Sequence, residues 1–289
     1  MTGPAAQRLE GGRLHLSHGP IDVVLQGFGP ADAVRAAETA AALRFRTILD
    51  ELVAELPELR RPVASGPFLQ GAVARRMREA CAPFAADGTF VTAMAAVAGA
   101  VADELLIAMR AAAPDLTRAF VNDGGDIAVF VAPGEALEIG LAAAPVPGTN
   151  FDGTLRIQHL SGIGGVATSG RHGRSFSLGI ADAVTVLARD AATADVAATL
   201  IANAVNLDSP AIARAPARSL DPDSDLGDLP VTTAVGTLTP EEVAAALEAG
   251  AARAGAWVEA GLIRGAALRL AGAARIVGAP FPTLPEPAP

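Results

Sequence analysis

The chain has 289 residues, enough for one large domain or two small ones with a sizeable buried core. Its net charge is −9 and its basic residues form no nucleic-acid-type run, so we expect no DNA or RNA partner. The single cysteine, Cys81, excludes an internal disulfide and a metal site built from several thiolates.

The N-terminal segment 1–12, MTGPAAQRLEGG, has no charged head followed by an apolar core, so we expect no signal peptide. We expect this segment to be flexible. Charges such as Arg35, Asp50 and Asp103 interrupt the apolar runs well short of a membrane span. These features predict a cytoplasmic protein that does not associate with a membrane.

The next elements are predicted from their apolar spacing. Residues 13–28 alternate partly and favour two short strands broken at Gly19-Pro20. Asp32 is expected to cap a helix that ends before Pro57. A shorter helix is predicted over 71–82. The apolar stretch 89–110 predicts another helix, whose small residues would let a second backbone approach closely.

The second half of the chain predicts more strands and two helices. Residues 119–131 indicate strand, tight turn and strand, and residues 193–205 indicate a helix. We expect 208–228 to be a loop. Thr239-Pro240-Glu241-Glu242 is typical of a helix start, with a hydroxyl cap, an early proline and a carboxylate three residues after the cap. Further strands are expected at 137–143, 154–160, 162–167, 184–187, 231–238, 266–272 and 274–278.

No internal repeat of 20 to 50 residues is present, which excludes a solenoid. Strands and helices alternate without one simple period, so the predicted fold is α/β or α+β. We expect a single domain over 13–278, with sheets covered by helices. The proline-rich tail 279–289 is expected to be disordered.

The turn Val121-Asn122-Asp123-Gly124-Gly125-Asp126 is the first candidate site. Its two glycines would let the backbone come close to a ligand. The Asn122 amide can donate and accept, and Asp126 could bind a ribose hydroxyl. The alternative is a hairpin whose residues serve only the geometry of the turn.

The second candidate site runs from Ala167 to Ser175. Thr168, Ser169 and Gly170 offer hydroxyls and backbone N–H groups that could converge on a phosphate. Nearby arginines could add charge-assisted donors, and His172 could titrate near neutral pH. The alternative is an arginine-rich surface loop, although its flanks are apolar.

The third candidate is the helix that carries Asp195 and Thr199. Residues four apart lie on one helical face, and a carboxylate, a hydroxyl and a backbone carbonyl are the hard oxygen donors that Mg²⁺ prefers. The alternative is that Asp195 only caps the helix near its N-terminus.

Taken together, VNDGGDI, VATSG and the helix bearing AD and Thr resemble the ApbE superfamily, the FAD:protein FMN transferases. The likeness is closer to the UPF0280 family, a branch of that superfamily. It also includes GPID, MAAVAGAVADE, GVATSGRHGRSFSLGIADAVTVLA and DSDLGD. The resemblance implies a T-fold-like α/β domain with mixed or antiparallel sheets.

The resemblance also implies a site. Its flavin- or nucleotide-facing turn would comprise Asn122, Gly124, Gly125 and Asp126, and its phosphate wall Thr168, Ser169 and Gly170. The Mg²⁺ ligands would be Asp195, Thr199 and a backbone carbonyl near Ala98.

The chain departs from the transferases in two places. They carry H-x-I-x-D-P-x-T-G after A-T-S-G, where this chain has RHGRSFSLGIADA, and a lysine in G-x-A-K-G that is absent here. These departures predict a changed ligand or reaction, with a polar set particular to this branch: Arg171, His172, Arg174 and Asp182. Of these, Arg171 would bind the ligand and the other three would be catalytic.

Three functions therefore remain open from the sequence. The chain could bind FAD, FMN or a similar phosphorylated ligand and carry out Mg²⁺-dependent transferase or hydrolase chemistry. It could bind or modify a pterin in tetrahydromethanopterin-linked one-carbon metabolism. It could also be a non-catalytic structural or assembly protein. A homodimer is a guess that no motif supports.

Overall fold

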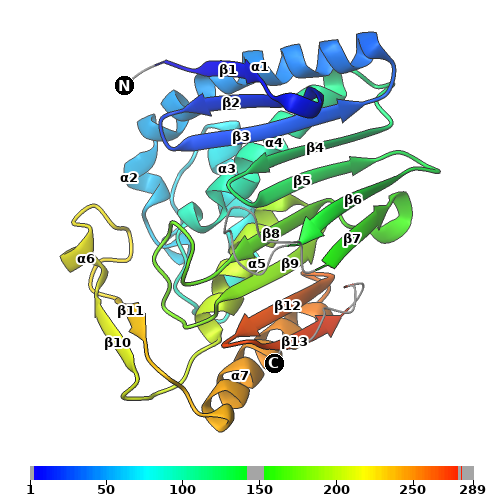
Figure 1. The fold of residues 1–289 in the computed structure, drawn as a ribbon. Helices are drawn as coiled ribbons and strands as arrows, with labels where there is room; N and C mark the ends of the chain where they lie inside the picture. Colours follow the sequence, from blue (N-terminus) through cyan, green and yellow to red (C-terminus); the bar gives the residue numbers. More distant parts are fainter. Residues whose placement is uncertain (1–2, 142–152, 279–280, 282–289) are drawn as a thin grey trace. The chain divides into compact units, whose positions relative to one another are not determined.

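A computed structural model of the chain describes residues 3–141, 153–278 and 281 (Figure 1). The chain divides into two units. The first comprises residues 1–137, 156–167 and 188–196, and the second 138–155, 168–187 and 197–289. The division falls inside several elements, which therefore contribute residues to both units.

The first unit is built on an antiparallel sheet. Its strands follow in the order β1 (Ala5–Arg8), β2 (Leu14–His18), β3 (Ile21–Phe28), β4 (Arg118–Asp123), β5 (Asp126–Val131) and β8 (Gly165–Ser169). Side chains alternate between buried and more exposed along β2 and β4, as expected for strands with one face against a core.

Helices cover that sheet (Figure 1). α4 (Val97–Ala112) contacts β3, β4 and β5, and α1 (Ala31–Ala54) packs against α4, β2 and β3. α3 (Ala72–Cys81) packs against α4, and α2 (Leu56–Leu59) is a single turn after α1. Short 3-10 turns occur at Glu10–Gly12, Val63–Ser65, Ala82–Ala85, Ala93–Ala96 and His159–Ser161.

The second unit contains the antiparallel strands β9 (Ala183–Ala188), β12 (Gly265–Leu270) and β13 (Ala273–Gly278). The long helix α7 (Pro240–Glu259) packs against β12 and β13. A separate ribbon pairs β10 (Ile212–Pro216) with β11 (Pro230–Val235), and α6 (Ala217–Leu220) follows β10. β6 (Ala136–Leu141) and β7 (Gly153–Gln158) form a two-stranded sheet, and α5 (Ala191–Ala204) has residues in both units.

The α/β prediction with antiparallel sheets and covering helices is confirmed, and the predicted strands and helices are present with shifted ends. The helix expected over 89–110 begins only at Val97, after the 3-10 turn at Ala93–Ala96. Residues 142–143 of the strand expected over 137–143 lie outside the described residues. Three further local predictions differ from the structure. Residues 208–228 are not one loop, because β10 pairs with β11 and α6 follows it. Asp32 lies in the first turn of α1, pairs with Arg35 and does not cap the helix.

The third difference concerns the N-terminal segment, which is expected to be flexible. Ala5–Arg8 instead pair with residues 14–17 of β2, and Arg8 forms an ion pair with the buried Glu38 of α1. A buried carboxylate needs such a partner, so the pair fixes β1 against α1. The predicted disordered tail, 279–289, lies outside the described residues except for 281. The single-domain boundary at 13–278 stays a prediction.

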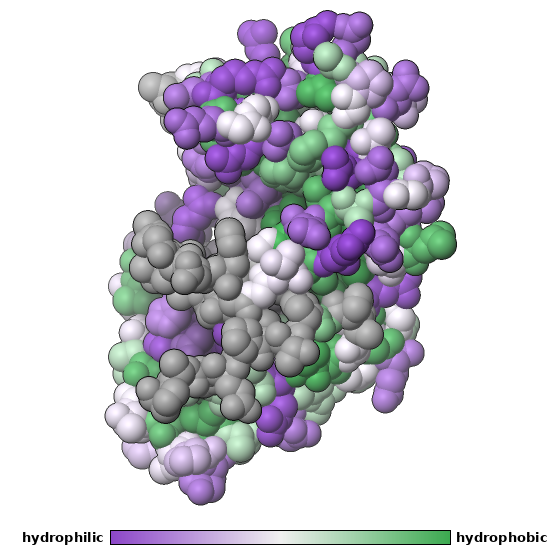
Figure 2. Space-filling model, turned by 45° about the vertical axis from the view of Figure 1, so that its right-hand side comes forward, coloured by the Kyte–Doolittle hydropathy of each residue, from purple (hydrophilic) through white to green (hydrophobic). Residues whose placement is uncertain are grey.

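The described surface is mixed in polarity. Large apolar side chains reach it at Phe68 and Leu160, and on the face displayed in Figure 2 apolar residues are interspersed with hydrophilic ones. Within the described residues, no helix combines the length and apolar character that a bilayer crossing requires.

The capping box of α7 gives a direct test of the predicted helix start. The Thr239 hydroxyl accepts the Glu242 amide at 3.2 Å, and the Glu242 carboxylate accepts the Thr239 amide at 2.8 Å. We expect Thr239→Ala to lower the free energy of unfolding by about 1 kcal/mol, measured by urea denaturation. Thr239→Ser keeps the acceptor and should stay near wild type; an equal loss in both variants would contradict the cap.

Candidate functional site

The N-terminal amides of α4 and of α5 are each bound by an aspartate carboxylate from the other helix, through residues that all lie in the first unit. Asp103, on α4, accepts the Ala191 amide at 3.0 Å and the Ala192 amide at 2.9 Å, the first two N–H groups of α5. These N–H groups have no partner inside the helix, so an acceptor there stabilises the helix start. Asp103 therefore joins the start of α5 to α4.

The reverse contact uses Asp195, on α5. Its carboxylate accepts the Gly99 amide at 3.0 Å and also a hydrogen bond from the Ala98 amide, both in the first turn of α4. The alternative that Asp195 caps its own helix is therefore wrong. Asp190 fills that role, because its carboxylate accepts the Thr193 amide at 2.7 Å.

Gly99 allows the two helices to meet. A Cβ atom at this position would overlap the Ala191 carbonyl group and the Ala192 nitrogen, which are backbone atoms that cannot rotate away. Gly164 and Gly165 show the same crowding against the backbone at Arg189, Asp190 and Ala191. The predicted role of small residues in close backbone approach is confirmed for Gly99.

Negative charge accumulates around Asp195. Burial, together with the nearby Asp123 and Asp103 carboxylates, raises the pKa of Asp195 to about 7, although the two α4 amides favour the ionised form. Burial likewise raises the pKa of Asp103 to about 7, opposed by its two amides and by Arg76. Asp103 and Asp123 are both buried, at 6% and 4% exposed.

The turn between β4 and β5 has the geometry of a glycine hairpin. The side-chain oxygen of Asn122, Oδ1, accepts the Gly125 backbone amide at 2.8 Å, and Gly124 and Gly125 have φ values of +66° and +116°. Asn122 thus holds the turn, and Asp126 begins β5. Their contact with a ligand stays a prediction.

The second unit holds the predicted phosphate wall. The Thr168 and Thr185 hydroxyls are 2.9 Å apart, and Thr199 donates to the Ser169 hydroxyl at 3.5 Å. Gly170 lies directly against the Asp182 backbone, where a Cβ would not fit. The wall is therefore a tightly packed strand end.

Asp182 gathers the polar residues that follow. Its carboxylate lies 2.8 Å from an Arg171 guanidinium nitrogen and 3.3 Å from His172 Nε2, and it accepts the Ala271 amide at 2.6 Å. Ala271 occupies the β12–β13 turn with a φ of +48°, a conformation that side-chain-bearing residues seldom adopt. Arg171, His172 and Asp182 are thus brought together, whereas Arg174 is exposed on the same loop.

The sequence comparisons identify the family. A model described as AbpE bacteria matches residues 6–276. The chain belongs to this AbpE family. The match begins within the segment that we expect to be flexible and includes residues 6–8 of β1.

Named relatives carry the designation UPF0280 protein, which confirms the predicted branch. The relative from Methanothrix thermoacetophila is 38% identical over 178 residues, covering 59% of this chain and 69% of its own. The relative from Methanopyrus kandleri is 37% identical over 182 residues, covering 62% and 68%. The apo structure of the flavinyl transferase ApbE from Pseudomonas stutzeri is 14% identical and has a TM-score of 0.36, over 95% of this chain and 93% of that one. This structural likeness is too weak to support the family assignment, which depends on the sequence comparisons.

The AbpE-family residues around Asp195 suit a hard divalent cation. They offer a carboxylate that has two further carboxylates, Asp123 and Asp103, as like-charged neighbours. Among the described residues, no group of three His, Cys, Asp or Glu side chains is arranged to hold a metal. A cation here would therefore depend on Asp195 with backbone, hydroxyl, water or ligand oxygens.

Two residues of this region were missed by the sequence analysis as site residues. Asp123 follows Ala119 and Val121 on the buried face of β4, so strand alternation would have placed it inside. Asp103 lies four residues after Gly99, on the same face of α4. In both cases the sequence periodicity indicates which face carries the carboxylate, but it does not indicate which residue the carboxylate contacts.

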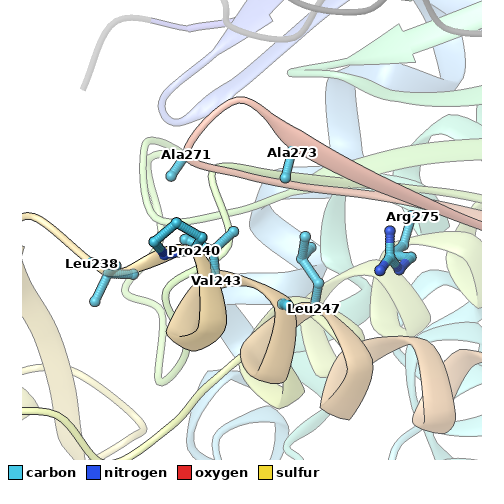
Figure 3. Close-up of a pocket in the computed structure, with 8 residues that line it drawn as sticks. Leu238, Pro240, Val243, Leu247, Ala271, Ala273 and Arg275 are labelled. Atoms are coloured by element: carbon cyan, nitrogen blue, oxygen red, sulfur yellow. The ribbon is translucent and has the colours of Figure 1, made fainter.

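A cavity in the second unit meets these residues only at Ala271, whose amide donates to Asp182. It has a volume of about 310 Å³ and lies between the start of α7 and the β12–β13 hairpin. Figure 3 shows Val243 and Leu247 facing Ala271 and Ala273, with Arg275 at one end. No predicted site residue lines it.

The close approach at Gly99 predicts a large cost for one added methyl group. We expect Gly99→Ala to lower the free energy of unfolding by at least about 2 kcal/mol, because backbone must move to admit the Cβ. Gly255→Ala is the matched control, since a Cβ there meets nothing within 4 Å, and it should stabilise α7 by up to about 1 kcal/mol. Equal changes in the free energy of unfolding for the two variants, measured by urea denaturation, would contradict the close packing at Gly99.

The raised pKa values of Asp103 and Asp195 predict a pH dependence of stability. Between about pH 4 and pH 7 the folded protein holds protons on these groups that the unfolded chain has released. The free energy of unfolding of the metal-free protein should therefore fall as pH rises through this window and level off above it. Urea denaturation across the window measures the slope, which Asp195→Asn should reduce; an unchanged slope would contradict the assignment.

Proposed function

We propose that this chain binds a flavin nucleotide or a similar phosphorylated ligand together with Mg²⁺, with Asp195 as the metal-binding carboxylate. The observation that carries the proposal is the charge balance at Asp195. Its carboxylate accepts two backbone amides and has Asp123 and Asp103 as nearby like charges. A divalent cation would offset that accumulated negative charge.

The family assignment supports the choice of ligand. The resemblance to the FAD:protein FMN transferases includes the turn at Asn122, the segment from Thr168 to Gly170, and the Asp195 helix. In this proposal Thr199 and a carbonyl near Ala98 are further metal ligands. The bound ion would stabilise negative charge on phosphate oxygens.

The protein side chains would then bind and orient the ligand. Thr168 and Ser169 present hydroxyls at the end of β8, and Gly170 packs that end directly against the Asp182 backbone. Arg171 is held by Asp182, which fixes its direction for contact with an anion. His172 shares the same carboxylate, so a proton moved by His172 would be coupled to that ion pair. Arg174 would add an exposed cation.

Calorimetric titration of the purified chain with FAD and FMN, with and without Mg²⁺, tests the proposal. We expect nucleotide binding that weakens by at least about tenfold when Mg²⁺ is removed or Asp195 is changed to Asn. The titration should be paired with a search for FMN and AMP in the FAD incubation, since their release would identify cleavage of the pyrophosphate.

Other outcomes would select the alternatives. Binding of a pterin without FAD or FMN binding would replace the flavin proposal with the pterin one. Loss of stability in Asp195→Asn with no binding of either ligand class would favour a structural or assembly role. The cytoplasmic location and a homodimer remain predictions that these titrations do not address.

A further inference from the structure

We infer that Asp103 is a positioning residue that sets where the Asp195 carboxylate lies against the first turn of α4. The expected effect of Asp103 on metal affinity rests on the proposed function. Its structural part depends only on contacts between described residues of the first unit. Asp103 itself would not contact the ion or the nucleotide.

The contacts form a closed circuit between two helices. Asp103, in α4, accepts the amides of Ala191 and Ala192. From Ala192 the chain advances three residues along α5 to Asp195, whose carboxylate returns to the Gly99 amide at 3.0 Å. From Gly99 four residues of α4 lead back to Asp103. Each carboxylate therefore holds the helix that carries the other.

This circuit fixes the register of α5 along α4. A displacement of α5 along its axis by one residue is about 1.5 Å, which would break both of the Asp103 hydrogen bonds at once. Gly99 allows the helices to approach at this point, and no side chain separates its Cα from the Ala191 carbonyl group. Asp103 thus controls the placement of Asp195 relative to the Ala98 and Gly99 amides.

Asp190 provides the matched control. It also presents a carboxylate to the start of α5, accepting the Thr193 amide at 2.7 Å, but its bond lies within that helix end. Losing Asp190 should weaken the start of α5 without releasing it from α4. A comparison of variants at Asp103 and Asp190 therefore distinguishes the loss of a helix cap from the loss of the contact between α4 and α5.

The experiment compares wild type, Asp103→Asn and Asp190→Asn in two measurements. The first is Mn²⁺ binding, followed by electron paramagnetic resonance of the free ion. We expect Asp103→Asn to weaken Mn²⁺ binding at least about tenfold and Asp190→Asn, which keeps an acceptor for the Thr193 amide, to leave it unchanged. Asp103→Glu, which keeps the charge but displaces the carboxylate by one methylene, should fold and still weaken binding.

The second measurement is amide hydrogen exchange at Ala98 and Gly99 in the metal-free protein. Exchange there should accelerate in the Asp103 variants and not in Asp190→Asn, because these amides report the position of Asp195. Unchanged exchange in the Asp103 variants, or equal Mn²⁺ affinity in all proteins, would overturn the inference. A wild type that binds no Mn²⁺ would overturn the proposed metal site, while the exchange data would still decide the role of Asp103.

Discussion

The exchange of carboxylates between α4 and α5 is the interaction on which the candidate site depends. Each helix would otherwise bury N–H groups without partners at its first turn, and each receives an aspartate from the other. Gly99 makes the exchange geometrically available by removing the side chain from the contact. The arrangement has a cost, because it concentrates carboxylates in a partly desolvated region and raises the pKa of both.

The raised pKa values bear on which ligand the site can bind. A carboxylate whose pKa is raised by burial and by like charges binds a cation more readily than one already neutralised by an arginine. The contrast with Asp182 is informative, since that carboxylate lies beside Arg171, His172 and the Ala271 amide. The first arrangement suits a metal ion, whereas the second orients a cationic side chain toward an anion.

The sequence predicts much of this fold because its signals are local. Thr239 and Glu242 specify a helix start, and Gly124-Gly125 specify a turn, from neighbouring residues alone. β11 lies in the strand expected at 231–238, but β10 was missed because its short sequence, IARAP, lies within the proline-containing stretch 208–228 that favours a loop. Asp103 was missed as part of the site because its partners, Ala191 and Ala192, are 88 and 89 residues away. The three candidate motifs were identified from their own residues, and the family resemblance joined them into one site.

Anomalous diffraction from crystals grown with Mn²⁺ tests the central claim most directly. The account predicts an anomalous peak within coordinating distance of the Asp195 carboxylate, which still accepts the Gly99 amide, and no such peak in crystals of Asp195→Asn. A wild-type structure in which Asp195 keeps only its amide contacts, with no peak beside it at saturating Mn²⁺, would contradict the account. In that case the reciprocal aspartates would serve the packing of α4 and α5 alone.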